Sequence, residues 1–337
     1  DSNPVDINFQ DTAMSGDIII SQNNPEDIAT AVVMALDELG FSGINSPKTL
    51  STQQQDELMR VLDTAELAHK QGVEVEPWAE FSLGMAAELV AQNSTAQGHF
   101  RIALVSFRSK KDRRGEAATL NKLGALVFLD SNEESKRYFV ESLTISREIG
   151  DRIQESTSIR WHGTHEIQCQ EYNKANRFYL ESLSISREIG DWQGEADSLR
   201  SLGENWWRPT RPMREEIDPL KIKSYFQESI IISRDNGDRN GEAKTLLALA
   251  HYHSGALKQM NKAIQYNYQA LAIYKEIGNS LGQLGIIESL IELVDAAESF
   301  EAAHGAKVGR LIQEGIVISQ ESGNLEREMY FIALKDD

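Results

Sequence analysis

Length, composition and charge restrict the classes of protein to which this chain can belong. Its 337 residues are 40% hydrophobic and 7% aromatic, which supports a packed core and argues against both a disordered acidic chain and a membrane protein. The 52 acidic and 34 basic residues give a formal net charge of −18, which repels nucleic acid and anionic lipid. We therefore expect no binding to nucleic acid and no insertion into a membrane.

The single cysteine, Cys169, excludes an internal disulfide framework and fits a reducing compartment. No stretch of the sequence approaches the roughly 18 apolar residues that cross a bilayer. We therefore expect a cytoplasmic protein.

The first 53 residues differ from those that follow. Residues 1–23 are acidic and polar and predict a flexible arm. Asn24, followed by Pro25 and two acidic residues, is typical of the start of a helix. Residues 24–53 are therefore predicted to form an N-terminal capping helix and a loop.

Residues 54–323 contain a repeat of about 40 residues. Its clearest copies read ESLTISREIGD at 141–151, ESLSISREIGD at 181–191 and ESIIISRDNGD at 228–238. A glycine that follows an apolar periodic run is a helix C-cap, since glycine enters the left-handed region without strain. On this criterion the units end near residues 72, 111, 150, 190, 237, 278 and 323, with Lys111 in place of glycine.

The residue after each of these C-caps predicts the start of another helix. Aspartate or asparagine there can accept hydrogen bonds from free amides of the next helix, and the residues concerned are Asp112, Asp151, Asp191, Asp238 and Asn279. Each unit is then a hairpin of two helices. Because one amphipathic hairpin cannot bury its apolar stripe alone, neighbouring hairpins must stack. The sequence thus predicts an all-α solenoid of antiparallel helix hairpins, which residues 324–337 close as a C-terminal capping helix through Leu325, Met329, Phe331 and Ile332.

This pattern resembles the tetratricopeptide repeat family. The matching residues of the first helices are Leu120, Leu123, Gly124, Leu199, Leu202, Gly203, Trp206, Leu246, Leu249 and Ala250, and small residues of the second helices are Ala175 and Ala263. The longer period is similar to the variant found in kinesin light chains, spindle-orientation adaptors and cyanobacterial signalling proteins. The resemblance implies a right-handed superhelix that holds other proteins and has no catalytic activity.

The resemblance also implies that the first helices line a concave surface that binds a peptide or a helix. The residues expected to contact a partner there are Asn121, Phe128, Arg160, Arg200, Glu204, Trp207, Arg208 and His251. Arg160 and Arg200 recur one repeat apart, so their guanidinium groups could bind acidic residues of a ligand. The alternative is that each pairs with a neighbouring acidic residue of this chain. Trp207 with Arg208 is the best candidate for a binding hot spot.

An insertion at residues 208–218 lengthens the fifth unit and contains two prolines, Pro209 and Pro212. A long loop in an array of short loops is often functional. It is equally compatible with an idle insertion, since surface loops accept added length at small entropic cost.

No motif for catalysis is present, and we expect neither an enzyme nor a cofactor. His162 with His165 and His251 with His253 are close enough in sequence to share a helix face, but neither pair has the further ligands of a metal site. The preferred hypothesis is a scaffold or regulator that binds a peptide or helix of a partner. The alternatives are a peptide-sensing or ligand-sensing regulatory module, and the repeat segment of a larger bacterial signalling or defence protein.

Overall fold

The computed structural model describes residues 25–41, 52–90, 92–208, 218–298, 304–322 and 324–336. The predicted arm at 1–23, most of the insertion and the expected C-cap Gly323 lie outside these residues. The described residues form α1 (Pro25–Glu38), α2 (Thr52–Lys70), α3 (Pro77–Leu89), α4 (Asn93–Lys110), α5 (Arg113–Leu126), α6 (Asn132–Ile149), α7 (Arg152–Gln168), α8 (Tyr172–Ile189), α9 (Trp192–Trp207), α10 (Pro219–Asp235), α11 (Arg239–Gly255), α12 (Met260–Glu276), α13 (Ser280–Glu298), α14 (His304–Glu321) and α15 (Leu325–Asp336).

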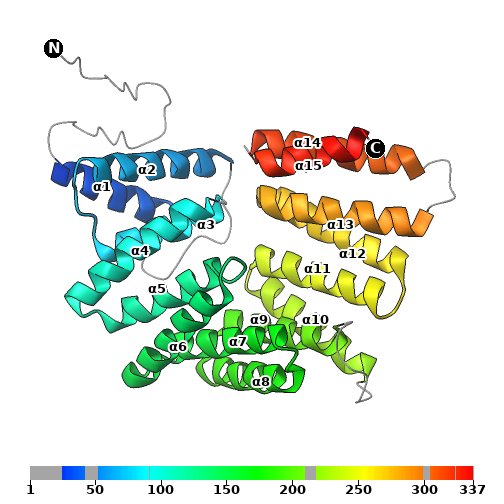
Figure 1. Ribbon diagram of the computed structural model, residues 1–337, viewed down its shortest axis with the longest axis horizontal. Helices are drawn as coiled ribbons and strands as arrows, with labels where there is room; N and C mark the ends of the chain where they lie inside the picture. Colours follow the sequence, from blue (N-terminus) through cyan, green and yellow to red (C-terminus); the bar gives the residue numbers. More distant parts are fainter. Residues whose placement is uncertain are drawn as a thin grey trace, which may run out of the picture.

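Consecutive helices pack as antiparallel hairpins, and the hairpins stack into a solenoid (Figure 1). This confirms the predicted all-α fold. Neighbouring first helices contact one another directly from α1 through α3, α5, α7 and α9 to α11. The array therefore bends with its first helices on the inner side, and the predicted capping helix α1 takes the place of a first helix.

The two ends of this arc come close together. Gln55 lies in the first turn of α2, and Gly278 lies in the turn between α12 and α13. A Cβ atom added at Gly278 would be 2.3 Å from Nε2 of Gln55, so these residues are in contact although 223 positions separate them (278 − 55). Figure 1 shows the N-terminal and C-terminal hairpins on the same side of the arc.

The turns between units have the predicted caps. Lys111, Gly150 and Gly190 adopt left-handed conformations with φ of 59°, 72° and 70°. The aspartate after each of these residues accepts a hydrogen bond from a backbone N–H three positions later, as Asp151 does from Gln154. One helix therefore ends and the next begins within two residues.

A buried glutamate near the start of α5 ties neighbouring helices together. Glu116 accepts hydrogen bonds from Arg108 at the end of α4 (2.9 Å) and from Arg113 of its own helix (2.7 Å). The same two arginines reach into the next hairpin, where Arg108 pairs with Glu141 at 2.5 Å and Arg113 with Glu148 at 2.7 Å. One buried carboxylate thus organises contacts across three helices, and we call this arrangement the glutamate–arginine ladder.

The ladder recurs in later units. Glu155 binds Arg147 and Arg152, at 3.0 and 2.6 Å. Burial alone would raise the pKa of Glu155, but the hydrogen bonds from both arginines outweigh burial and lower it. The ladder residues of the remaining units are Glu195 with Arg187, and Glu242 with Arg234 and Arg239. Glu195 has a single ladder arginine because Trp192 stands where the other units have a second one.

Buried serines fill the centre of the array, between the apolar clusters of its two ends. Ser156 on α7 lies 2.9 Å from the hydroxyl of Ser182 and 2.8 Å from that of Ser186 on α8. These side chains are buried, and small hydroxyls that bond to one another let helices approach closely without orphaned polar atoms. The serines shared by the sequence repeats therefore belong to the packing.

The C-terminal cap differs from its prediction in detail. Phe331 is fully buried against Gly315 of α14, as expected. Leu325, Met329 and Ile332 are exposed, because α15 has no further hairpin on its outer face within the described residues. Only Phe331 of the four predicted residues covers the last hairpin fully.

Replacing Glu242 by glutamine should destabilise the protein more than the same change at Glu195. The side chain of Glu242 is 3% exposed and holds two arginines, whereas that of Glu195 is 21% exposed and holds one. We expect losses of about 1–3 kcal/mol for Glu242→Gln and below about 1 kcal/mol for Glu195→Gln. Urea unfolding followed by circular dichroism measures both, and equal losses would contradict the ladder.

Gly124→Ala should also destabilise the chain, by about 1–3 kcal/mol, because a Cβ there would be 2.7 Å from the ring of Phe139. Gly98→Ala is the matched control, since a Cβ at this helical position meets nothing within 4 Å. The control should leave stability unchanged or raise it by up to about 1 kcal/mol. Thermal unfolding of both variants shows whether the close approach of the Phe139 ring, and not helix propensity, requires glycine at position 124.

Candidate peptide-binding surface

The inner face of α7 and α9 carries a chain of charged side chains. Arg160 Nη2 lies 3.3 Å from Asp197 Oδ2, and Arg200 Nη2 lies 2.9 Å from Asp197 Oδ1. Arg200 also donates to Glu204 Oε1 at 3.1 Å. The side chains of Arg160 and Arg200 are only 14% and 19% exposed. The structure therefore brings both predicted arginines together through one carboxylate.

The sequence left open whether the two arginines bind a ligand or pair with acidic residues of this chain. In the structure, both pair with acidic residues of the chain. Burial would raise the pKa of Asp197, but the charges of Arg160, Arg200 and Lys244 hold it far below its ordinary range. Burial would lower the pKa of Arg200, and Glu204 with Asp197 raise it instead. Asp197 and Arg200 are therefore both charged at every physiological pH.

Sequence reasoning missed two members of this surface, Asp197 and Lys244. Lys244 of α11 is exposed, yet the protein around it lowers its pKa through desolvation. Asp197 stands three residues before Arg200, a spacing that places both on one helix face. That spacing was a usable signal, whereas the approach of Lys244 from the next unit depends on tertiary structure.

The predicted aromatic residues are part of the packing. Trp207 is half-buried; its ring contacts Tyr252 at a centroid distance of 6.3 Å, and a Cβ added at Gly255 would meet it. Phe128 is also half-buried, between Trp161 and His165. Both rings pack against a neighbouring unit, so only part of each ring is exposed to solvent.

Asn121 does not lie on the surface. Its side chain is buried, where Nδ2 donates to Gln154 and Oδ1 accepts from Ser158. The prediction of a contact between Asn121 and a partner is therefore wrong, because the amide is used to hold α5 against α7.

Two predicted residues are open to solvent. Arg208 is the C-cap of α9, and His251 lies on α11. Although part of His251 reaches solvent, desolvation by the surrounding protein lowers its pKa, and this effect outweighs the opposing charges of Glu204 and Glu292. His251 is therefore neutral near pH 7 and can both donate and accept a hydrogen bond.

The histidine pairs noted in the sequence do not meet to form a metal site within the described residues. His165 is buried between Phe128 and Phe139, and its Nε2 lies 3.3 Å from the hydroxyl of Ser135. Desolvation lowers the pKa of His165 to about 4. His165 is accordingly a neutral core residue.

The pKa of His165 predicts a pH dependence of stability. Its ordinary value is 6.5, so the unfolded chain takes up a proton here between pH 6.5 and 4 while the folded chain does not. The contribution of neutral His165 to the free energy of unfolding should be fully present above pH 6.5 and should fall by about 2–3 kcal/mol as the pH drops toward 4. Chemical unfolding at several pH values should give a shallower profile for His165→Gln than for wild type. An unchanged profile would show that other groups cause the loss.

No helix among the described residues has the length and apolar character needed to cross a membrane. No protein-family model matches the sequence, and no curated protein matches it either.

Solved structures share the fold at low sequence identity. A Rap protein complexed with competence and sporulation factor is 13% identical, with a TM-score of 0.60 and coverage of 93% of this chain and 86% of that chain. The Rap conjugation gene regulator of plasmid pLS20, in complex with the Phr* peptide, is 14% identical, with a TM-score of 0.60 and coverage of 93% and 82%.

A third similar structure is longer. It is a signal transduction ATPase with numerous domains and a tetratricopeptide repeat sensor, from Pyrococcus horikoshii, and it is 19% identical with a TM-score of 0.51. The match covers 88% of this chain but only 42% of that protein. These comparisons show that the chain has a tetratricopeptide-like helical solenoid fold.

Proposed function

We propose that this chain is a non-catalytic regulatory module that binds an extended peptide, or a peptide-like segment of a partner protein, on the inner face of its first helices. The observation that carries this proposal is the network of Arg160, Asp197, Arg200 and Glu204. These side chains are largely buried and fixed by one another, although they lie on the inner side of the array.

A network of this kind favours binding because it is already ordered. Each guanidinium group has five N–H donors, and the ion pairs of Arg200 occupy two of its terminal nitrogens. The donors that remain are held in place before a ligand arrives, which lowers the entropic cost of binding. Lys244 of the next unit lies close enough for its charge to lower the pKa of Asp197. A ligand with a carboxylate fits this surface best.

The remaining predicted residues surround this network. Arg208 continues α9 beyond Glu204, and His251 on α11 lies close enough to feel the charge of Glu204. Trp207 and Phe128 offer the exposed parts of their rings. We assign these four residues to the edge of the binding surface. Aromatic and arginine side chains commonly anchor a partner at interfaces.

The comparisons support a peptide as the ligand class. The two Rap structures, whose fold this chain shares along 93% of its length, were solved with competence and sporulation factor and with the Phr* peptide. A second candidate function is the sensor segment of a longer signalling protein, favoured by the match to less than half of the Pyrococcus ATPase. Both functions use the same inner face.

Selection from a display library of random short peptides tests the proposal. Peptides enriched on the wild-type chain should contain acidic residues, and Arg200→Gln should weaken their binding about 10-fold to 100-fold, since a hydrogen bond to a charged group contributes about 1.5–3 kcal/mol. Arg177→Gln on α8 is the matched control, because this exposed arginine lies on a second helix.

Fluorescence anisotropy with the enriched peptides measures these affinities. Equal weakening by both variants would show a nonspecific charge effect. Binding that Arg200→Gln leaves intact would place the site elsewhere on the array.

A further inference from the structure

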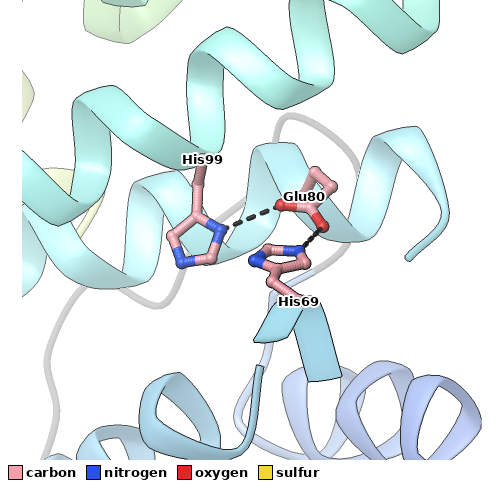
Figure 2. Close-up of side chains that lie close together, drawn as sticks. All are labelled: His69, Glu80 and His99. Atoms are coloured by element: carbon pink, nitrogen blue, oxygen red, sulfur yellow. Dashed lines mark hydrogen bonds and ion pairs between the residues drawn. The ribbon is translucent and has the colours of Figure 1, made fainter. Parts of the chain in front are cut away.

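Two histidines and a glutamate meet where the first hairpin joins the second. His69 lies near the end of α2, Glu80 near the start of α3 and His99 on α4. Figure 2 shows the carboxylate of Glu80 between the two imidazole rings. Nε2 of His69 is 2.6 Å from Oε1 of Glu80, and Nδ1 of His99 is 2.9 Å from Oε2. One donor atom of each residue lies within 4.8 Å of those of the other two.

The cluster is unusual because it holds a carboxylate that has no contact with solvent. The side chain of Glu80 is 0% exposed and that of His99 is 6% exposed, while His69 is 25% exposed. Among the described residues, the ion-pair contacts of Glu80 are with these two imidazoles alone. The glutamates of the ladder are buried too, but their charges are balanced by arginines.

The cluster also interrupts the repeat at a defined position. His69 stands three residues before Gly72, and the next four units have the ladder arginine at this position, as Arg108, Arg147, Arg187 and Arg234. In the first unit an imidazole thus replaces a guanidinium, and its acidic partner is Glu80. A guanidinium has no lone pair to offer, whereas a neutral imidazole nitrogen is a common metal ligand.

We propose that His69, Glu80 and His99 bind a divalent transition-metal ion, preferentially zinc. Two imidazole nitrogens and one carboxylate, with a fourth position left for water, form a recurrent donor set for zinc. The nitrogen ligands disfavour magnesium and calcium, which prefer oxygen. The ion would balance the buried charge of Glu80.

The donor atoms lie close enough to be brought onto one ion, since every pair of them is within 4.8 Å. Metal–ligand bonds of about 2.0–2.2 Å place tetrahedral ligands roughly 3.3 Å apart, so the present contacts of 2.6 and 2.9 Å must open by about half an ångström. The partial exposure of His69 provides access for the ion and for a water ligand.

Bound metal would cross-link the start of the array. His69 belongs to the first hairpin, and Glu80 and His99 belong to the second, so the ion joins α2 to α3 and α4. The same helix α2 carries Gln55, which touches Gly278 at the far end of the array. Metal occupancy would thus stabilise the contact that closes the arc.

Zinc titration of chelator-treated protein tests the site. Competition with a chromophoric chelator should show one zinc ion per chain with micromolar or tighter affinity, and the melting temperature should rise on zinc addition. Glu80→Gln and His99→Gln should each weaken binding at least about 100-fold, more than the loss typical of an outer-shell partner. His251→Gln is the control and should bind zinc as wild type does.

A spectroscopic measurement on the wild-type chain covers the case in which the variants misfold. Cobalt(II) should give the visible absorption of a four-coordinate site, and one equivalent of zinc should abolish it. No zinc binding by the wild-type chain, or unchanged binding by both folded ligand variants, would overturn the proposal. A cobalt spectrum of the hexa-aqua ion would overturn it equally.

Discussion

The buried carboxylate at the start of a first helix is the constraint on which the array depends. A carboxylate out of contact with water requires charged partners, and Glu116, Glu155 and Glu242 obtain them from the end of the preceding helix and from their own first turn. Because the arginines of these units also reach the following hairpin, the pairing sets the distance between one hairpin and the next. The motif of glycine, aspartate, arginine and glutamate at the unit boundaries therefore contains the residues that make this contact.

The ladder lies at the turns between units, and this position leaves the inner face free to vary. Arg160 and Arg200 recur one repeat apart, whereas Asp197 and Lys244 belong to single units. Their charges are nevertheless organised by the same rule, since a half-buried guanidinium also requires an acidic partner. Both join helices, but the ladder lies at the turns between units, whereas the inner network lies along α7 and α9.

The first unit shows what happens when the ladder is interrupted. His69 replaces the arginine, and Glu80 obtains its partners from two imidazoles instead of two guanidinium groups. A permanent cation is thereby exchanged for groups that bind protons or metals. The first unit is also the one whose helix α2 contacts the turn between α12 and α13.

The sequence by itself determined the helical fold and the caps of its helices, because these follow from interactions among residues close in the chain: glycine at the C-cap, aspartate at the N-cap and an apolar stripe of helical period. It also paired Arg160 with Arg200 by their repeat spacing, and the structure joins the two through Asp197. It misplaced Asn121, whose amide forms hydrogen bonds with Gln154 and Ser158 of the next unit. It could not bring Lys244 toward Asp197, Gln55 to Gly278, or His69 to Glu80 and His99. Those contacts join separate helices or units, and only the curvature and stacking of the hairpins decide which side chains from distant segments share one place.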